Sequence, residues 1–403
     1  MAKIKNCSVC RKKQIAELID FGEQVVCHHF LKSPQDKDYR HNLALGQCRA
    51  CGTVQLTDRM PVKELKPRYD WLKCSEPEAH LDRLVEKISQ LPGITKDSKI
   101  CGISFKDDST LDRFNKLGFK NTWRADPRNE LEVSDPIIGF QSIQENFNSK
   151  SAQRLIDNHG KVDILIARHI IEHAYDFRQF VESSKQMVSS DGYIIFEIPD
   201  CQRAFDKCDY MTLWEEHTIY FTGETFRNCF GFTGLSLIHF ENVAYSVEDS
   251  YVGIAKVNIS VNDPVLREDN LNREIFRAEK FADEYDNKKN RIKQFLADYG
   301  QKKGKVVLFG GGHMSCTFLN LFELKDCVDF VVDDNPNMRG LFMPGSGLPI
   351  LESKAIYEQD AKLCILTLSL ASEEKVIQNN KRFLEKGGTF VSVFPGSKWA
   401  MNI

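Results

Sequence analysis

Apolar and polar positions along the chain follow two different periods, which predict alternating strands and helices. Short continuous apolar runs at 99–104, 163–167 and 193–198 are typical of buried parallel strands. Over 177–188, apolar residues recur instead at every third or fourth position, which predicts a helix between the last two strands. Such an order of strand, helix and strand predicts a parallel sheet with helices on its faces.

A second alternating pattern begins near residue 304. Residues 305–309 and 329–332 read as strands, and between them Gly310–Ser315 forms a glycine-rich turn into a helix. The spacing G-x-G-x-x-S, with acids about 20 residues further on, is the arrangement that holds a diphosphate at a helix N-terminus and a ribose beside it. Either the domain is a Rossmann-like support, or the turn binds NAD(P) or a nucleotide-sugar. The candidate nucleotide ligands are Gly310, Gly312 and Asp333.

The chain is long enough for several domains. Its 403 residues allow two or three hydrophobic cores. Residues 243–259 alternate as strands that would complete the central sheet, and a charge-rich stretch at 270–300 predicts one long linking helix or two broken ones. The predicted fold class is therefore multidomain α/β, with a cysteine-rich module at 1–60, a parallel-sheet α/β domain at 61–265, a helical linker at 266–303 and a Rossmann-like α/β domain at 304–403.

Four of the 13 cysteines form two C-x2-C pairs, Cys7/Cys10 and Cys48/Cys51. A pair at this spacing lets two thiolates reach one ion from a tight turn, and two pairs complete a tetrahedral Zn²⁺ site. Because all four positions are then filled by protein, we predict a structural zinc. The segment Cys27–His29 offers spare ligands, although a strand packed on the zinc module is the favoured interpretation of it.

Composition excludes some partners. The chain carries 54 basic and 57 acidic residues, a net charge of -3, so neither nucleic acid nor an anionic membrane is an expected partner. No apolar run reaches the roughly 18 residues that a membrane helix needs, and the first residues lack the apolar stretch of a signal peptide. We therefore expect a cytoplasmic protein with reduced thiols. The oligomeric state is not predicted.

Polar residues gather where the predicted central strands end, which is the edge at which open α/β sheets bind ligands. Arg168, His169 and His173 follow the strand at 163–167, and Trp214–His217 forms a polar cluster inside an aromatic segment. A functional role is favoured for His173 and His217. His169 is more simply a core histidine, because it follows the strand directly.

Three further residues have two interpretations of similar weight. Arg168 is either a ligand for an anionic group such as a diphosphate or a capping residue. Trp214 is either core or a wall of a substrate site. Asp126 follows a strand predicted at 121–125, where α/β nucleotide sites often hold ribose hydroxyls, but it also suits a capping acid before Pro127.

Several motifs occur together in a characteristic order: two C-x2-C pairs, ARHIIEH, DGYIIFEIP, EEHTIYFT, and then VVDDNP, MPGS and LPI. This combination resembles the sugar C-methyltransferases that act on nucleotide-linked keto-deoxyhexoses, over essentially the whole chain. The resemblance implies a class I methyltransferase-like central domain, S-adenosylmethionine as cofactor and a nucleotide-linked sugar as substrate. It also implies that His217 is the base that removes a proton beside a ketone, and that Glu216 and His173 bind the sugar. The candidate substrate ligands are Tyr69, Arg168, His169 and Trp214.

One motif departs from that family. Its cofactor loop normally reads acid-x-G-x-x-x-G after the first strand, but here the acid position falls on Gly102 and the glycine positions fall on Ser104 and Asp108. Side chains there should crowd the methionine part of the cofactor. Either the loop binds S-adenosylmethionine in another conformation, with Gly102, Ser104 and Asp126 as ligands, or the scaffold serves a keto-sugar epimerase, isomerase or NAD(P)-dependent reductase. A non-catalytic nucleotide-sugar binding protein is a third interpretation.

Overall fold

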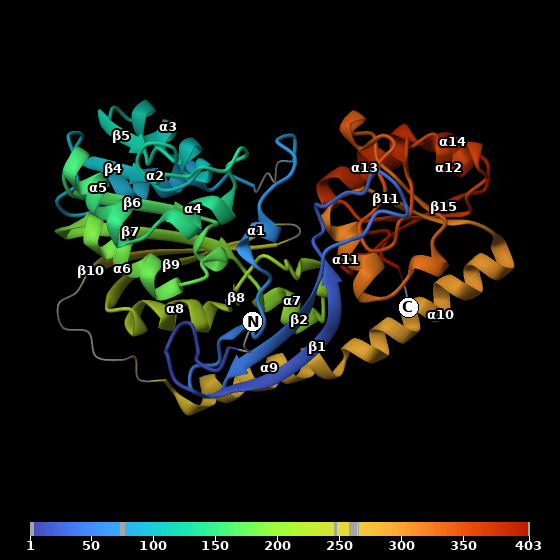
Figure 1. Ribbon diagram of the computed structural model, residues 1–403, viewed down its shortest axis with the longest axis horizontal. Helices are drawn as coiled ribbons and strands as arrows, with labels where there is room; N and C mark the ends of the chain where they lie inside the picture. The colour runs from blue at the N-terminus through green and yellow to red at the C-terminus, as the bar shows by residue number, and fades with distance from the viewer. Residues whose placement is uncertain (1–3, 73–76, 246–247, 258–263, 265, 402–403) are drawn as a thin grey trace. The chain divides into compact units, whose positions relative to one another are not determined.

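The computed structural model describes the chain except for residues 1–3, 73–76, 246–247, 258–263, 265 and 402–403 (Figure 1). The described chain divides into two compact units. The first unit consists of Met1–Ile19, Ala44–Arg203 and Glu216–Ala278, and the second unit of Asp20–Leu43, Ala204–Glu215 and Glu279–Ile403. Each unit is thus built from three separate stretches of sequence.

The first unit contains a six-stranded sheet in the order β5-β4-β6-β7-β10-β9. The first four strands are parallel, and β10 runs antiparallel to both of its neighbours. This is the parallel α/β sheet predicted from the sequence pattern, in the class I methyltransferase-like form that the family resemblance implies. The strands are β4 (Lys99–Gly102), β5 (Asn121–Arg124), β6 (Val162–Arg168), β7 (Val188–Pro199), β9 (Leu235–Val243) and β10 (Ser250–Val257), so that Asn258 and Ile259 of the predicted strand region lie outside the described residues.

Helices cover both faces of this sheet because successive strand residues point to opposite sides (Figure 1). On β6, Ile164 and Ile166 pack with α2 and α3, whereas Leu165 and Ala167 pack with α5, α6 and α8. Full burial of one such aliphatic side chain contributes about 1.5–3 kcal/mol. The helices are α2 (Leu81–Ser89), α3 (Asp108–Lys116), α5 (Ser149–His159), α6 (Phe177–Met187) and α8 (Gly223–Phe232).

A smaller sheet of order β1-β2-β3-β8 carries the cysteine-rich module. Its last strand, β8, is only two residues long and pairs with β3 through Val54–Tyr220 and Gln55–Ile219. The module is therefore joined by backbone hydrogen bonds to the segment that directly follows His217. The strands of this sheet are β1 (Ile15–Val25), β2 (Arg40–Cys48), β3 (Val54–Leu56) and β8 (Ile219–Tyr220). The first unit also has short helices, which are α1 (Val62–Leu65), α4 (Phe140–Asn146), η1 (Phe105–Asp107) and η2 (Ile171–His173).

The second unit contains a five-stranded parallel sheet in the order β13-β12-β11-β14-β15. Numbered within the unit this order is 3-2-1-4-5, which is the Rossmann-like topology predicted from the sequence. The strands are β11 (Val306–Phe309), β12 (Phe330–Val332), β13 (Ile350–Leu351), β14 (Leu363–Leu366) and β15 (Thr389–Ser392), with α7 (Gln202–Lys207), η3 (Tyr210–Thr212), α11 (His313–Leu321), η4 (Lys325–Cys327), η5 (Pro336–Met338), α12 (Ala355–Glu358), α13 (Leu370–Asn379) and α14 (Lys381–Glu385).

The predicted helical linker forms two helices, α9 (Glu268–Asp283) and α10 (Tyr285–Lys303). The second of the two arrangements anticipated from the sequence is thus present. Among the described residues, no helix is both long and apolar enough to span a bilayer.

Candidate active site and zinc centre

The four predicted zinc ligands come together. The sulfur atoms of Cys7 and Cys51 are 3.6 Å apart, as are those of Cys10 and Cys48. Sulfurs at the corners of a Zn–S tetrahedron with 2.3 Å bonds are separated by ~3.8 Å. All four thiols are free of disulfides, so the cluster fits one Zn²⁺ ion with its full set of thiolate ligands.

The two cysteine pairs are held by turns of the same design. The N–H of Arg11 donates to the carbonyl of Cys7, and the N–H of Gly52 donates to the carbonyl of Cys48. Both donors have a left-handed backbone, with φ of 63° and 77°. Each turn closes just after its second cysteine, which directs both thiols of the pair to one point.

The end of β6 is occupied by a closed network around Arg168. This side chain is only 1% exposed, and its Nε donates to Oε2 of Glu197 at 2.6 Å. The other carboxylate oxygen of Glu197 lies 3.2 Å from His169 and 3.2 Å from His80. Burial alone would raise the pKa of Glu197, but the cation and the two rings beside it hold that pKa well below its usual range. Arg168 and His169 are therefore buried partners of Glu197, and Nη2 of Arg168 is buried without a hydrogen-bond partner.

The atypical loop after β4 is organised by Asp107, which the sequence analysis did not single out. Its carboxylate accepts the N–H groups of Ile103 and Ser104 at 2.8 Å each and that of Arg168 at 3.0 Å. A Cβ placed on Gly102 would lie 2.6 Å from the Cβ of Asp107. The side chain of Asp107 thus fills the space into which an acid at position 102 would project.

The two residues that replace glycines in this loop need no glycine conformation. Ser104 has a φ of -122° and turns its hydroxyl inward to cap η1, and Asp108 has a helical φ of -52° and pairs with Arg124 at 2.9 Å. Both side chains are engaged by the protein itself. The family pattern has its acid at the position of Gly102, whereas in this chain the acid is Asp107, so a carboxylate still lies under the loop. The residues present therefore fit a loop that binds S-adenosylmethionine.

Asp126 lies two residues after the end of β5, at a position for which the sequence leaves both a ribose ligand and a capping acid open. Its carboxylate accepts the N–H groups of Arg128 and Asn129 at 2.7 and 3.0 Å, which makes it a capping acid. The N–H of Asn129 lowers the pKa of Asp126, so the group is ionised at neutral pH. Carboxylate oxygens have further acceptor capacity, so capping does not prevent Asp126 from binding a ribose hydroxyl.

The two histidines favoured as functional lie against each other. The rings of His173, in η2, and His217 have centroids 4.6 Å apart and are nearly perpendicular. Glu172 joins them, and each of the three offers one ligand atom within 4.8 Å of the others. The N–H of Thr218 donates to the carbonyl of Glu172 at 2.7 Å, which ties the two segments together. Phe140 stacks on His173 at 4.8 Å.

A chain of hydrogen bonds fixes the tautomer of His173. The backbone N–H of Tyr175 can only donate, and it does so to Oε1 of Gln144 at 3.0 Å. The amide nitrogen of Gln144 therefore donates to Gln141, whose own amide nitrogen faces Nδ1 of His173 at 3.1 Å. Because Nδ1 accepts, the neutral ring of His173 carries its proton on Nε2. Gln141 also lies 3.5 Å from the half-buried carboxylate of Glu216.

Two predicted substrate ligands, Tyr69 and Trp214, each pack against another ring. Tyr69 lies on the segment before α2, partly exposed, with its ring 5.0 Å from that of Trp71. Trp214 belongs to the second unit, where its ring stacks on His313 with centroids 3.7 Å apart. This stacking partner could not be found from the sequence, because the two residues are far apart in the chain.

The glycine-rich turn of the second unit does not support NAD(P). Oδ2 of Asp333 accepts the N–H of Gly311 at 2.7 Å, and Oδ1 accepts the N–H of Asn335 at 2.8 Å. The N–H of Gly311, which a diphosphate would need as a donor, is therefore already bonded to the carboxylate of Asp333. The negative charge of Asp333 would also repel a diphosphate. Gly310 and Gly312 remain as the turn into α11. Of the two interpretations, the supporting Rossmann-like domain agrees with this geometry.

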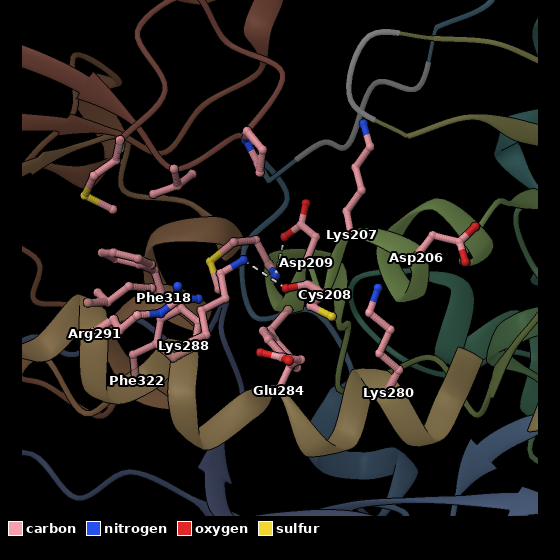
Figure 2. A pocket seen from close by; sticks show the side chains of 16 residues that line it. Asp206, Lys207, Cys208, Asp209, Lys280, Glu284, Lys288, Arg291, Phe318 and Phe322 are labelled. Carbon is pink, nitrogen blue, oxygen red and sulfur yellow. Dashed lines mark hydrogen bonds between the residues drawn. The ribbon is translucent and has the colours of Figure 1, made fainter. Parts of the chain in front are cut away.

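The second unit also contains a hollow of about 370 Å³ that none of the predicted site residues lines (Figure 2). Acids and bases alternate around it, among them Asp209, Glu284 and Arg291. Lys288 donates from its Nζ to the carbonyl of Cys208 at 2.9 Å, and burial lowers the pKa of this lysine. The mixed charge of the walls favours no single class of ligand.

Three family models match successive parts of the chain. A zinc binding domain matches residues 7–65, a methyltransferase domain matches 78–240, and a C-methyltransferase C-terminal domain matches 246–395. The chain therefore belongs to the C-methyltransferases that combine these three domains, and it is an enzyme that uses S-adenosylmethionine.

Among individual proteins, the chain is similar to C-methyltransferase NovU of Streptomyces niveus. The two are 22% identical over 424 aligned residues, which cover 97% of this chain and 96% of the relative. Solved structures match more remotely. A chain of the complex between the Trm112 methyltransferase activator of Haloferax volcanii and a methyltransferase covers 45% of this chain and is itself covered to 91%, at 10% identity and a TM-score of 0.31. The 1,6-didemethyltoxoflavin-N1-methyltransferase of Burkholderia thailandensis with S-adenosylhomocysteine covers 45% and is covered to 79%, at 9% identity and a TM-score of 0.30.

Proposed function

We propose that this enzyme methylates a carbon beside the ketone of a nucleotide-linked keto-deoxysugar, with His217 as the general base. The observation that carries the proposal is the buried pair of His173 and His217, in which hydrogen bonds to the protein set the proton of one ring. The sugar class is supported by the sequence resemblance, and methylation of carbon by the match to C-methyltransferase NovU over nearly the whole chain.

The two rings suit the two needs of enolate chemistry. A proton beside a ketone is acidic enough for removal by a positioned imidazole near neutral pH, and the developing enolate oxygen needs a hydrogen-bond donor. His173, with its proton on Nε2, is such a donor. The ring of His217, whose centroid lies 4.6 Å from that of His173, would be the neighbouring base. Glu216, 3.5 Å from the amide of Gln141, would hold a sugar hydroxyl or orient the base.

The loop after β4 and Asp126 would hold S-adenosylmethionine, which supplies an electrophilic methyl group when bound. Phe105 of this loop is 38% exposed, and its ring packs on Phe140 at 4.7 Å. Phe140 in turn stacks on His173. An aromatic row therefore leads from the cofactor loop to the histidine pair, which supports a reaction centre between them.

The test is to compare the wild-type enzyme with His217→Ala and His217→Gln. Transfer of labelled methyl from S-adenosylmethionine to a panel of nucleotide-linked 4-keto-deoxysugars should fall by about 10²–10⁴-fold, the usual worth of a general base. Incorporation of solvent deuterium beside the ketone should fall in parallel. Binding of S-adenosylhomocysteine, measured by calorimetry, should persist because the cofactor loop is intact.

Two results would contradict the proposal. Turnover at the wild-type rate in both variants would remove His217 as the base. Deuterium exchange without methyl transfer, in wild-type enzyme that binds no S-adenosylhomocysteine, would point to an epimerase or isomerase on the same scaffold.

A further inference from the structure

Within the second unit, three side chains that bind metals converge from distant parts of the chain. Cys27 follows β1, Glu215 follows η3, and His313 is the first residue of α11. Each offers one ligand atom, and the three atoms lie within 4.8 Å of one another. Cys27 and Glu215 are buried and the side chain of His313 is 10% exposed.

Hydrogen bonds to the backbone aim two of these groups at each other. Nε2 of His313 lies 3.1 Å from the carbonyl oxygen of Leu213, which can only accept, so Nε2 carries the proton and the lone pair is on Nδ1. Nδ1 faces Oε2 of Glu215 at 3.6 Å. The other oxygen of Glu215 accepts the N–H of Cys27 at 2.7 Å. The stacked ring of Trp214 holds the imidazole plane.

This arrangement places two acceptors face to face with no proton between them. The distance of 3.6 Å between Nδ1 and Oε2 is too long for a hydrogen bond and suits two ligands of one ion. A buried carboxylate requires compensation by a cation. No lysine or arginine among the described residues supplies it.

We propose that Cys27, Glu215 and His313 bind a second Zn²⁺ ion, separate from the four-cysteine site. The donor set of one sulfur, one imidazole nitrogen and one carboxylate oxygen is of the type that Zn²⁺ takes. The carbonyl of Leu213 orients the histidine from its far nitrogen, as is usual for a metal-bound imidazole. With Cys27 as thiolate, the ion and its ligands are neutral overall. One tetrahedral position remains for water or another small ligand.

The ion would join the three stretches that make up the second unit. Residues 20–43 supply Cys27, residues 204–215 supply Glu215, and the Rossmann-like part supplies His313. Metal binding free energy would then stabilise the folded unit directly. The site would therefore stabilise the second unit, to which the four-cysteine site contributes no ligand.

The test is zinc stoichiometry of the full-length protein, purified with reductant and zinc, by inductively coupled plasma mass spectrometry. Two zinc ions per chain are expected in the wild type. Glu215→Gln keeps the acceptor for the N–H of Cys27 but removes the charge, and it should reduce the content to one. Cys27→Ser should do the same. Cys229→Ser, at a buried thiol far from either cluster in sequence, is the matched control and should retain two.

Cobalt substitution distinguishes the sites without relying on a variant. The four-thiolate site should give an intense sulfur-to-cobalt charge-transfer band, and a second equivalent of Co²⁺ should add a weaker band, lost in Glu215→Gln. A wild type that saturates at one ion would overturn the proposal. Two ions in both the wild type and Glu215→Gln would overturn it as well, and loss of the second ion in His173→Ala would move it to the histidine pair.

Discussion

The two glutamines behind His173 show how uncharged residues can set the position of a proton on a histidine ring. Gln144 is locked by the N–H of Tyr175, and Gln141 is locked by Gln144, so the direction of each amide follows from one backbone group. The sequence carries no hint of this relay, because glutamines on a short helix have no distinctive spacing. His173 and His217 could be named from their motifs, whereas the group that orients His173 could not.

Replacing Gln141 by glutamate should reverse the tautomer of His173. A carboxylate only accepts, so it would draw the proton to Nδ1 and leave Nε2 without one. The rate of methyl transfer is expected to fall by about 10²-fold, while binding of S-adenosylhomocysteine is unchanged. Nitrogen chemical shifts of the histidines report the tautomer. Gln153→Glu, at an exposed position of α5, is the control. It should change neither the rate of methyl transfer nor the nitrogen chemical shifts of His173.

Because the acid stands at position 107 instead of 102, the double variant Gly102→Asp/Asp107→Gly should restore the cofactor binding that each single substitution weakens. Asp107→Gly removes the acceptor of three N–H groups, and Gly102→Asp alone would collide with Asp107. Each loss of a buried partner costs about 1–3 kcal/mol, so each single variant should weaken binding of S-adenosylhomocysteine by roughly tenfold or more. The double variant should recover much of the affinity. If the double variant binds worse than both single variants, the two positions do not share one role.

At the scale of elements, β6 and β7 end in a buried ion pair. Arg168 and Glu197 neutralise each other where the two parallel strands finish side by side. From the sequence alone, Arg168 is either a ligand or a cap, because nothing in the sequence shows that a glutamate of the next strand lies beside it. The register Arg168–Glu197 places both side chains on one face of the sheet, and this pairing depends on tertiary structure.

Glu197→Gln should therefore destabilise the first unit strongly. It removes the carboxylate that the buried guanidinium contacts at 2.6 Å and leaves Glu78, 3.5 Å from Nη1, as its remaining acid partner. Loss of one partner of a buried pair costs about 3–5 kcal/mol. The double variant Arg168→Met/Glu197→Leu should be markedly more stable than Glu197→Gln, because it removes both charges. Urea unfolding measures the difference. Equal stability of the single and double variants would show that the pair contributes through shape alone.

The same pair predicts the direction of acid sensitivity. The folded-state pKa of Glu197 lies below its unfolded value, so its contribution to stability is full above the unfolded pKa of about 4.3 and is lost as pH falls through the lower folded value. The unfolding free energy of the wild type should decrease more steeply in that acidic window than that of the Arg168→Met/Glu197→Leu variant.

At the scale of the whole molecule, the zinc module and the histidine pair are linked through one short strand. The four-cysteine turns anchor β2 and β3, and β3 pairs with β8, which begins two residues after His217. The two parallel sheets and the cysteine cluster were predictable from periodicity and spacing, and the Rossmann-like character of the second sheet from its glycine-rich turn. The link was not, because a two-residue strand leaves no pattern in the sequence.

Removal of the four-cysteine zinc should therefore reduce catalysis from a distance. Chelation or Cys48→Ser is expected to lower methyl transfer by more than tenfold while binding of S-adenosylhomocysteine persists, since β4 and β5 belong to the other sheet. Activity should return when zinc is added back to the chelated wild type but not to Cys48→Ser. Unchanged activity in fully demetallated protein would show that β8 holds His217 without the module.

The second unit is assembled from three separated stretches of chain, and this has a consequence for inheritance. A single recombination event that exchanges residues 304–403 between relatives would carry His313 but leave Cys27 and Glu215 behind. Such a hybrid would pair ligands that had not been selected together. Viable chimaeras should therefore exchange 20–43, 204–215 and the C-terminal stretch as one set, even though they are read from distant parts of the gene.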